Sequence, residues 1–181
     1  MLANLRVNLR RALALSLVLV IVCLAYTFLE TGIGQLFFRH QADGSLSAYG
    51  STEIAQSWTS PKWFIGRNDT PNPQASGPTN YGPRSIQLYE QVKARVAQLE
   101  KEGITPTNGL VTGSGSGLDP DIAPADAYAQ VDAVAKANGL SVSAVHGLVA
   151  SQVVGRYLGF FGSPYVNVLE LNVALSKLEH N

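Results

Sequence analysis

One uninterrupted apolar run, residues 12–29, constrains this chain more than any other feature of its sequence. It reads ALALSLVLVIVCLAYTFL and contains no charged residue, proline or glycine. At a rise of about 1.5 Å per residue, such a helix measures roughly 27 Å, close to the roughly 30 Å hydrocarbon core of a bilayer. A helix that is apolar on every side is unusual in a soluble domain. We therefore expect a transmembrane helix over this run, with the rest of the chain at the membrane surface.

Two other kinds of N-terminal segment share this pattern. A cleavable signal peptide has an apolar core of only about 7–15 residues, and no clean small-x-small cleavage site follows the run. A lipoprotein signal would end at Cys23, the only cysteine, but Val22 stands where a small residue is expected. The apolar run also continues well past that cysteine. We interpret the run as an uncleaved anchor and keep a signal peptide as the alternative.

The charged residues beside the run predict its orientation. Arg6, Arg10 and Arg11 precede it without any acid. Basic residues are retained on the cytoplasmic side of a membrane. Residues 1–11 are therefore predicted to be cytoplasmic and residues 30–181 extracytoplasmic, in a single-pass protein of the cell membrane.

Charge limits the partners of the exported part. From residue 31 onward, ten Lys or Arg face twelve Asp or Glu, which gives a formal charge of −2. No basic stripe is present, so nucleic acid is excluded as a partner. Only 14% of the chain is charged, which suggests surfaces that are covered by membrane lipid or by other subunits.

No catalytic or metal-binding set assembles from the sequence. The three histidines are scattered, and neither a Gly-x-Ser-x-Gly nor a His-Glu-x-x-His motif occurs. The glycine-rich stretch 113–117 lacks the Lys and Ser or Thr that complete a P-loop, because Leu118 and Asp119 follow it. The acidic cluster that begins at Asp119 lacks the closing Glu of a calcium loop. We expect no catalytic residue, no metal and no tightly bound cofactor.

Hydrophobic periodicity predicts an α+β domain after the span. Prolines, glycines and Asn or Asp crowd residues 67–85, which predicts a long irregular loop of the kind that often contacts partners. Ser85 is a suitable cap, and Gly103 a suitable stop, for an amphipathic helix that buries Tyr89, Val92, Val96 and Leu99. Both tryptophans are expected in the core. The remaining expected elements are short strands at 45–49 and 110–112, and helices at 124–138, from 141 or 143 to 153, and at 166–178.

Six stretches of the sequence form recognisable motifs: TGIGQ (31–35), QADGS (41–45), PQASG (73–77), VTGSGSGLDP (111–120), GRYLGFFG (155–162) and VNVLELNVAL (166–175). Read together and in order, they resemble the C-subunit family of the Kdp-type potassium-transporting P-type ATPase. The resemblance covers essentially the whole chain. The usual Pro-Ser-Ala after Gly-Arg is replaced by Asn68-Asp69-Thr70, and positions 78–79 and 163–165 also depart from the family pattern.

The resemblance implies a non-catalytic subunit of a high-affinity potassium uptake pump. Its implied partners are a channel-like potassium-translocating subunit, a P-type ATP-hydrolysing subunit and a small accessory subunit. It also implies a chaperone role that raises the ATP affinity of the hydrolysing subunit, and ATP as a possible ligand. An extracytoplasmic domain cannot touch ATP where ATP is hydrolysed, so we favour an assembly or gating role. The alternative is a free-standing anchored domain that binds a solute or an envelope component.

We expect the loops at 67–85 and 111–120 to dock on the potassium-translocating subunit. The candidate interface residues are polar residues and glycines of the matching motifs: Gln74, Ser76, Gly77, Asn80, Ser114, Ser116, Gly117, Asp119, Asn167 and Asn172.

Overall fold

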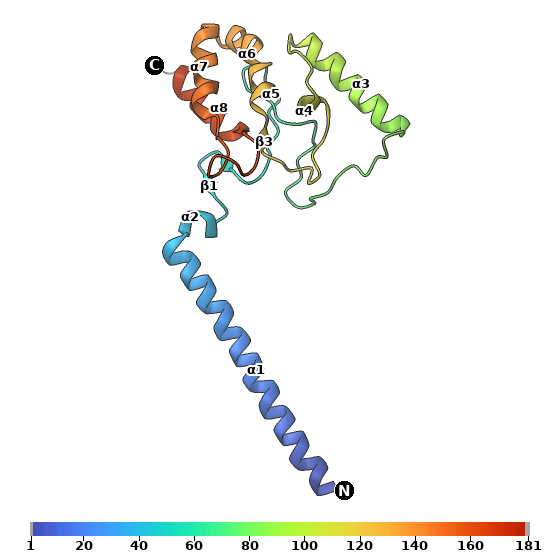
Figure 1. Ribbon diagram of the computed structural model, residues 1–181, viewed down its shortest axis with the longest axis vertical. Coiled ribbons are helices and arrows are strands. Elements are labelled where there is room, and N and C mark those ends of the chain that lie inside the picture. Colours follow the sequence, from blue (N-terminus) through green and yellow to red (C-terminus); the bar gives the residue numbers. More distant parts are fainter. Residues whose placement is uncertain (1, 180–181) are drawn as a thin grey trace. The chain divides into compact units, whose positions relative to one another are not determined.

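The computed structural model describes residues 2–179 and divides the chain into two units, of which the first ends at Leu46 and the second begins at Ser47. The first unit is dominated by the helix α1 (Leu2–Phe37), which contains the whole apolar run (Figure 1). Its part from Arg6 to Phe37 has a mean hydropathy of 2.7 in its most apolar window and is long and apolar enough to cross a membrane.

A short helix follows at the end of the first unit. This helix, α2 (Arg39–Ala42), begins two residues after α1 ends. Asp43 accepts a hydrogen bond of 3.0 Å from the Gln35 side chain and lies 3.7 Å from the Arg39 guanidinium. Met1, Asn181 and His180, the third histidine of the chain, lie outside the described residues.

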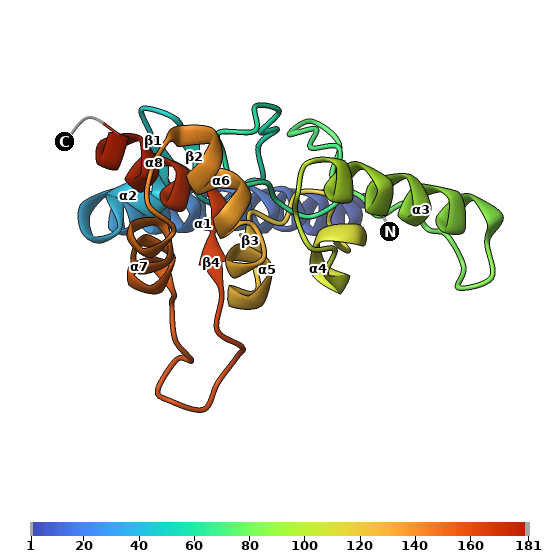
Figure 2. The same cartoon turned by 90° about the horizontal axis from the view of Figure 1, so that it is seen from above.

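Helices predominate in the second unit, and its strands are only two residues long. The strands β3 and β4 pair antiparallel, with Asp121 opposite Asn167 and Ile122 opposite Val166. α3 and α4 lie at one side of this unit and α5 to α8 at the other (Figures 1 and 2). The bounds are β1 (Leu46–Ser47), β2 (Gly50–Ser51), α3 (Ile86–Lys101), α4 (Asn108–Val111), β3 (Asp121–Ile122), α5 (Pro124–Tyr128), α6 (Val131–Asn138), α7 (Val142–Gln152), β4 (Val166–Asn167) and α8 (Val168–Glu179).

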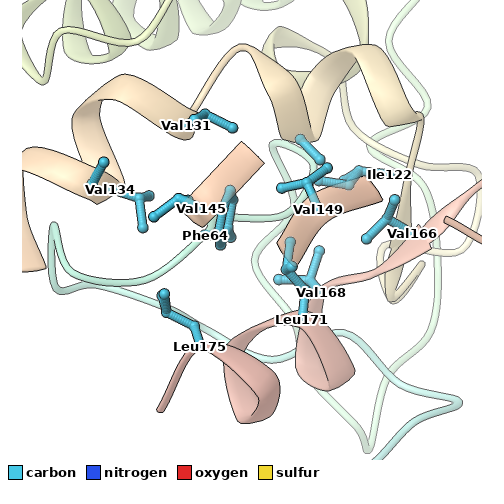
Figure 3. Packing of buried hydrophobic residues seen from close by; sticks show 12 residues of the cluster. Phe64, Ile122, Val131, Val134, Val145, Val149, Val166, Val168, Leu171 and Leu175 are labelled. Atoms are coloured by element: carbon cyan, nitrogen blue, oxygen red, sulfur yellow. The ribbon is translucent and has the colours of Figure 1, made fainter. Parts of the chain in front are cut away.

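The main core of the second unit lies among α5 to α8 and the β3–β4 pair. Its side chains point toward one another from these elements and from the extended segment that contains Phe64 (Figure 3). A smaller core packs Leu99 of α3 against Ile104, Leu110 and Val111. The buried members of the main core are Phe64, Ile122, Ala127, Val131, Val134, Ala135, Val145, Val149, Val166, Val168, Leu171 and Leu175.

Two buried amide side chains hold the extended segment at Phe64 and Ile65. Asn172 accepts a hydrogen bond from the Phe64 N–H and donates one to the Phe64 carbonyl, both at 2.9 Å. Gln130 does the same for Ile65, at 2.8 and 3.1 Å. A buried backbone must find hydrogen-bond partners, and here side chains provide what a neighbouring strand would otherwise supply.

The predicted helix ends are largely confirmed. Ser85 accepts a hydrogen bond of 3.3 Å from the Leu88 N–H at the start of α3. Gly103 follows α3 with φ = +75°, a left-handed conformation that costs glycine little. Ser141 caps α7 through a 3.2 Å hydrogen bond from the Ala144 N–H.

Three predictions of local structure are wrong. Residues 110–112 do not form a strand, because Thr107 caps a helical turn by accepting a hydrogen bond from the Leu110 N–H. The helix predicted over 124–138 is broken after Tyr128 into α5 and α6. Gln130 lies at the break, where its side chain reaches the segment at Ile65. Tyr89 is 63% exposed and does not join the buried face of α3.

Candidate docking site on two joined loops

The two loops that the sequence singled out lie against one another in the second unit. The carbonyl of Ser116 accepts a hydrogen bond of 2.7 Å from the Gly77 N–H and one of 3.0 Å from the Ser76 hydroxyl. The composition of both loops excludes regular helices or strands at these positions. Their backbone groups therefore find partners in each other, and we name residues 67–80 and 112–119 together the joined loops.

A carboxylate forms a second link between the joined loops. Asp69 accepts a hydrogen bond of 2.8 Å from the Ser114 N–H and one of 2.6 Å from the Ser114 hydroxyl. The Ser114 and Ser116 hydroxyl oxygens are 3.3 Å apart. A charged acceptor makes stronger hydrogen bonds than a neutral one, so this link helps to fix the glycine-rich stretch.

Arg67 and Asn68 form a third link between the joined loops, next to the link at Asp69. The Arg67 guanidinium donates to the Gly113 carbonyl at 3.1 Å and to the Thr112 hydroxyl at 3.4 Å. The Asn68 N–H donates to the Thr112 carbonyl at 3.2 Å. Links at several points along both loops restrain them more than a single contact would.

Gly117 allows the closest approach of the two loops. Its φ is +68°, and a Cβ at this position would lie 2.7 Å from the Gly77 carbonyl oxygen. A side chain at residue 117 therefore needs both an unfavourable backbone conformation and a displaced neighbour. At Gly115 a Cβ would meet nothing within 4 Å.

The glycine-rich stretch does not form a phosphate cradle. Such a cradle needs several free backbone N–H groups that converge on an anion. Here the Ser114 N–H donates to Asp69 and the Leu118 N–H donates to the Ser116 hydroxyl. The Asp69 carboxylate also brings negative charge to the place that a phosphate would need, so this loop is suited to holding its neighbour loop.

The structure brings five of the predicted interface residues together: Ser76, Gly77, Ser114, Ser116 and Gly117. Three further predicted interface residues, Gln74, Asn80 and Asp119, belong to the joined loops. Gln74 and Asn80 are exposed. Asp119 is half-buried and accepts a hydrogen bond of 3.1 Å from the Asp121 N–H.

Asn167 and Asn172 do not belong to this site. Asn172 is 1% exposed, and both ends of its amide bind the Phe64 backbone. Asn167 is 7% exposed; it donates to the Asp121 carboxylate and accepts a hydrogen bond from the Glu170 N–H at the start of α8. Their polar groups are used inside the unit, so we correct their assignment from interface residues to internal ones.

A cleft of about 490 Å³ borders the joined loops, and sequence reasoning missed it. Trp58 and Trp63 line it, with ring centroids 5.6 Å apart. Both tryptophans are half-buried at the edge of the main core, so they are core residues only in part. Arg67 and Arg95 bring two guanidinium groups to the same cleft, and Asp69 is one of several acids there.

Arg95 is held at the cleft by neighbouring backbone groups. It lies on α3 and donates to the Leu110 carbonyl at 3.1 Å. Burial lowers its pKa from the ordinary value, and the charge of Glu102 opposes that change. The only sequence signal for this cleft was an arginine close to the apolar positions of α3. The cleft could not be predicted as a whole, because segments that are far apart in the chain line it.

Metal-binding groups are not gathered at this site. Within residues 2–179, no three His, Cys, Asp or Glu side chains lie close enough to hold a metal ion. His146 is exposed and stacks on Tyr128, with ring centroids 4.6 Å apart. The described contact of this histidine is therefore a ring contact at the surface.

Comparison with known proteins identifies the family. A KdpC family model, described as the c chain of the K+-transporting ATPase, matches residues 9–177. A potassium-transporting ATPase KdpC subunit of Sorangium cellulosum is 47% identical over 183 residues, which cover 93% of this chain and 96% of the relative. One of Burkholderia ambifaria is 48% identical over 166 residues, covering 84% and 86%. One of Caldanaerobacter subterraneus subsp. tengcongensis is 41% identical over 181 residues, covering 93% and 94%. The chain belongs to the KdpC family of K+-transporting ATPase subunits.

Proposed function

We propose that this chain is a non-catalytic subunit that stabilises an ATP-driven potassium uptake pump and docks on the potassium-translocating subunit through its joined loops. Its other partners are the ATP-hydrolysing subunit and the small accessory subunit of the same pump. The observation that carries the docking proposal is the set of links between Asp69 and Ser114 and between Gly77 and Ser116. An interface that is already ordered loses less conformational entropy when its partner binds.

The exposed side chains of the joined loops suit a polar interface. Gln74 and Asn80 are exposed amide residues within the 67–80 segment. Amide side chains carry both donors and acceptors, so they suit recognition of a partner's backbone and polar side chains. The links between the loops use mainly serine, aspartate and backbone groups, and these amides remain on the surface.

We propose that α1 crosses the cell membrane with the N-terminus in the cytoplasm and the second unit outside. The arginines that precede the apolar run support this orientation. The side chains in the most apolar window of α1 make no buried contact within the described chain, so they are available to lipid or to the membrane helices of other subunits. Packing between such helices stabilises membrane complexes.

In this orientation, an effect on ATP affinity is indirect. The second unit lies across the membrane from cytoplasmic ATP, so it acts by favouring one conformation of the pump. Such an effect is a coupling free energy between distant sites and needs no contact with the nucleotide. We therefore propose that the chaperone role implied by the resemblance works through assembly and gating.

The cleft favours a second candidate function, the binding of a small solute whose anionic group meets Arg67 and Arg95 and whose cationic or hydroxyl groups meet the Asp69, Glu102 and Asp119 carboxylates. Its volume of about 490 Å³ falls in the range of ligand sites. The buried Nε of Arg67 has no hydrogen-bond partner among the described residues. A rise in the unfolding temperature of the full chain with phosphate or citrate, lost in Arg95→Gln, would support this function. No rise with either anion would count against it.

Two experiments test the main proposal. The full chain, expressed with the other pump subunits and purified in mild detergent, is expected to carry the ATP-hydrolysing subunit with it. A chain that elutes alone contradicts the subunit role. A reporter fused to the C-terminus is expected to be extracytoplasmic, and a cytoplasmic signal would overturn the orientation and the indirect route to ATP.

A further inference from the structure

The connection between α7 and β4 forms a hairpin that projects from the second unit (Figure 2). Val154 and Tyr165 exchange two backbone hydrogen bonds at its base, of 2.9 and 3.1 Å. Tyr157 and Phe161 form a second bridge nearer the tip. We name residues 154–165 the aromatic hairpin. The connection is thus paired at two points along its length.

The tip of the aromatic hairpin exposes large apolar side chains. Tyr157 is 74% exposed, Leu158 is 68% exposed and Phe160 is 64% exposed. The rings of Phe160 and Phe161 lie together, with centroids 4.2 Å apart. A contiguous apolar patch on an exposed projection marks a surface that contacts a membrane or another protein.

The backbone of the tip is already hydrogen-bonded within the hairpin. The Tyr157 N–H donates to the Phe161 carbonyl at 2.9 Å, and the Phe161 N–H donates back at 3.0 Å. The Gly159 N–H donates to the Arg156 carbonyl at 3.1 Å, and the Phe160 N–H donates to the Tyr157 carbonyl at 3.3 Å. Four N–H groups of the tip therefore have internal partners, which lowers the desolvation cost of moving the tip into an apolar medium.

The charge of the hairpin suits the surface of a bilayer. Residues 154–165 include Arg156 and contain no acid. Arginine is attracted to anionic headgroups, and tyrosine favours the boundary between headgroups and acyl chains. Tyr157 and Tyr165 provide such rings beside the apolar tip.

A covalent link keeps the second unit close to a membrane that α1 spans. Only residues 38–46 separate α1 from the second unit. Fully extended, this segment covers roughly 30 Å. The bilayer is therefore present at high effective concentration for any apolar surface of this unit.

We propose that the aromatic hairpin inserts Leu158, Phe160 and Phe161 into the headgroup–acyl boundary of the bilayer that α1 crosses. Arg156 then lies at the phosphate level. The insertion gives the second unit a second membrane contact, which limits its rotation about the linker. The inference depends on α1 being a span, and it does not depend on the orientation of α1 or on docking by the joined loops.

A fluorescent reporter tests this contact in the full chain. Cys23→Ala removes the only native thiol, and Phe160→Cys then carries an environment-sensitive label. The chain is placed in nanodiscs of phosphatidylcholine and phosphatidylglycerol without other subunits. Lys136→Cys, exposed on α6, carries the same label as the matched control. The emission of Trp58 and Trp63 reports that each variant is folded.

Insertion predicts emission at shorter wavelength, and quenching by spin-labelled lipid, for the label at residue 160 and not for the one at residue 136. Adding Phe161→Ser is expected to reduce both effects. Equal emission and quenching at the two positions would overturn the proposal. Protection of residue 160 that occurs only after the other pump subunits are added would also overturn it, in favour of a protein contact.

Discussion

The carboxylate of Asp69 binds both the backbone N–H and the hydroxyl of Ser114, at 2.8 and 2.6 Å. The two residues are 45 positions apart in the chain. Asp69 belongs to the proline-rich loop, and Ser114 to the glycine-rich stretch, so this pair links the two loops. Substitutions in this pair test whether the two loops must be linked to each other for the chain to bind its partner subunit.

Removing the Asp69 carboxylate is expected to loosen the joined loops. In Asp69→Ala, the Ser114 N–H and hydroxyl lose their acceptor, at a cost of about 1–3 kcal/mol for charge-assisted bonds. The unfolding temperature of the full chain in mild detergent, followed by tryptophan fluorescence, should fall. Less ATP-hydrolysing subunit should also co-purify with it.

Thr70→Ala is the matched control for this substitution, because Thr70 is the exposed neighbour of Asp69. It should leave both measurements unchanged. If Asp69→Ala lowers the unfolding temperature but not the recovery of the other subunit, the fixed loops stabilise the unit without serving as its docking surface.

A methyl group at residue 117 is expected to push the joined loops apart. In Gly117→Ala, the left-handed conformation costs about 1–2 kcal/mol, and the new Cβ would lie 2.7 Å from the Gly77 carbonyl oxygen. Faster hydrogen exchange at the Gly77 N–H, which donates to Ser116, is the direct readout. Gly115→Ala adds the same methyl group into open space and should not change that exchange. Equal exchange in the two variants would contradict the close approach.

The parts of the fold that depend on neighbouring residues could be predicted from the sequence. The start of α3 at Ser85 and its end before Gly103 follow from local capping chemistry. The α1 helix follows in the same way from its unbroken apolar run. Each of these features is determined within a few residues of the chain.

The features that depend on distant residues could not be predicted. Asn172 binds the Phe64 backbone across 108 positions, and no local pattern distinguishes a buried asparagine from an exposed one. Both Asn172 and Asn167 were therefore assigned to a surface. The sequence predicted two docking loops, but their links to each other, and the cleft beside them, arise from tertiary packing.

Replacing Asn172 by leucine is expected to destabilise the main core. Leucine has a similar volume, but it leaves the Phe64 N–H and carbonyl without partners, at about 1–3 kcal/mol for each unsatisfied group. A large fall in unfolding temperature and rapid exchange of the Phe64 N–H should follow. Asn108→Leu, at an exposed position, is the control. A Phe64 N–H that stays protected in Asn172→Leu would show that another group holds this segment.

The charge of Asp121 is expected to make stability depend on pH. Burial raises the pKa of this carboxyl above its ordinary value of 3.8, and the hydrogen bond from Asn167 opposes the shift. The nearby acids Asp119, Glu170 and Glu53 raise the pKa further. The folded state therefore holds this proton more tightly than the unfolded state does. The resulting stabilisation is complete below pH 3.8 and is lost as the pH rises through the raised pKa.

Asp121→Asn removes this titration and keeps an oxygen that can accept the hydrogen bond from Asn167. The unfolding temperature of the variant, compared with that of the unchanged chain, should therefore rise as the pH increases from below 3.8 toward neutrality. Because the carboxyl is half exposed, solvent screening keeps the gain below about 1 kcal/mol. Glu100→Gln, which removes an exposed charge on α3, should give no comparable trend. If the unfolding temperatures of Asp121→Asn and the unchanged chain differ by the same amount at every pH in this range, the pKa of Asp121 is not raised.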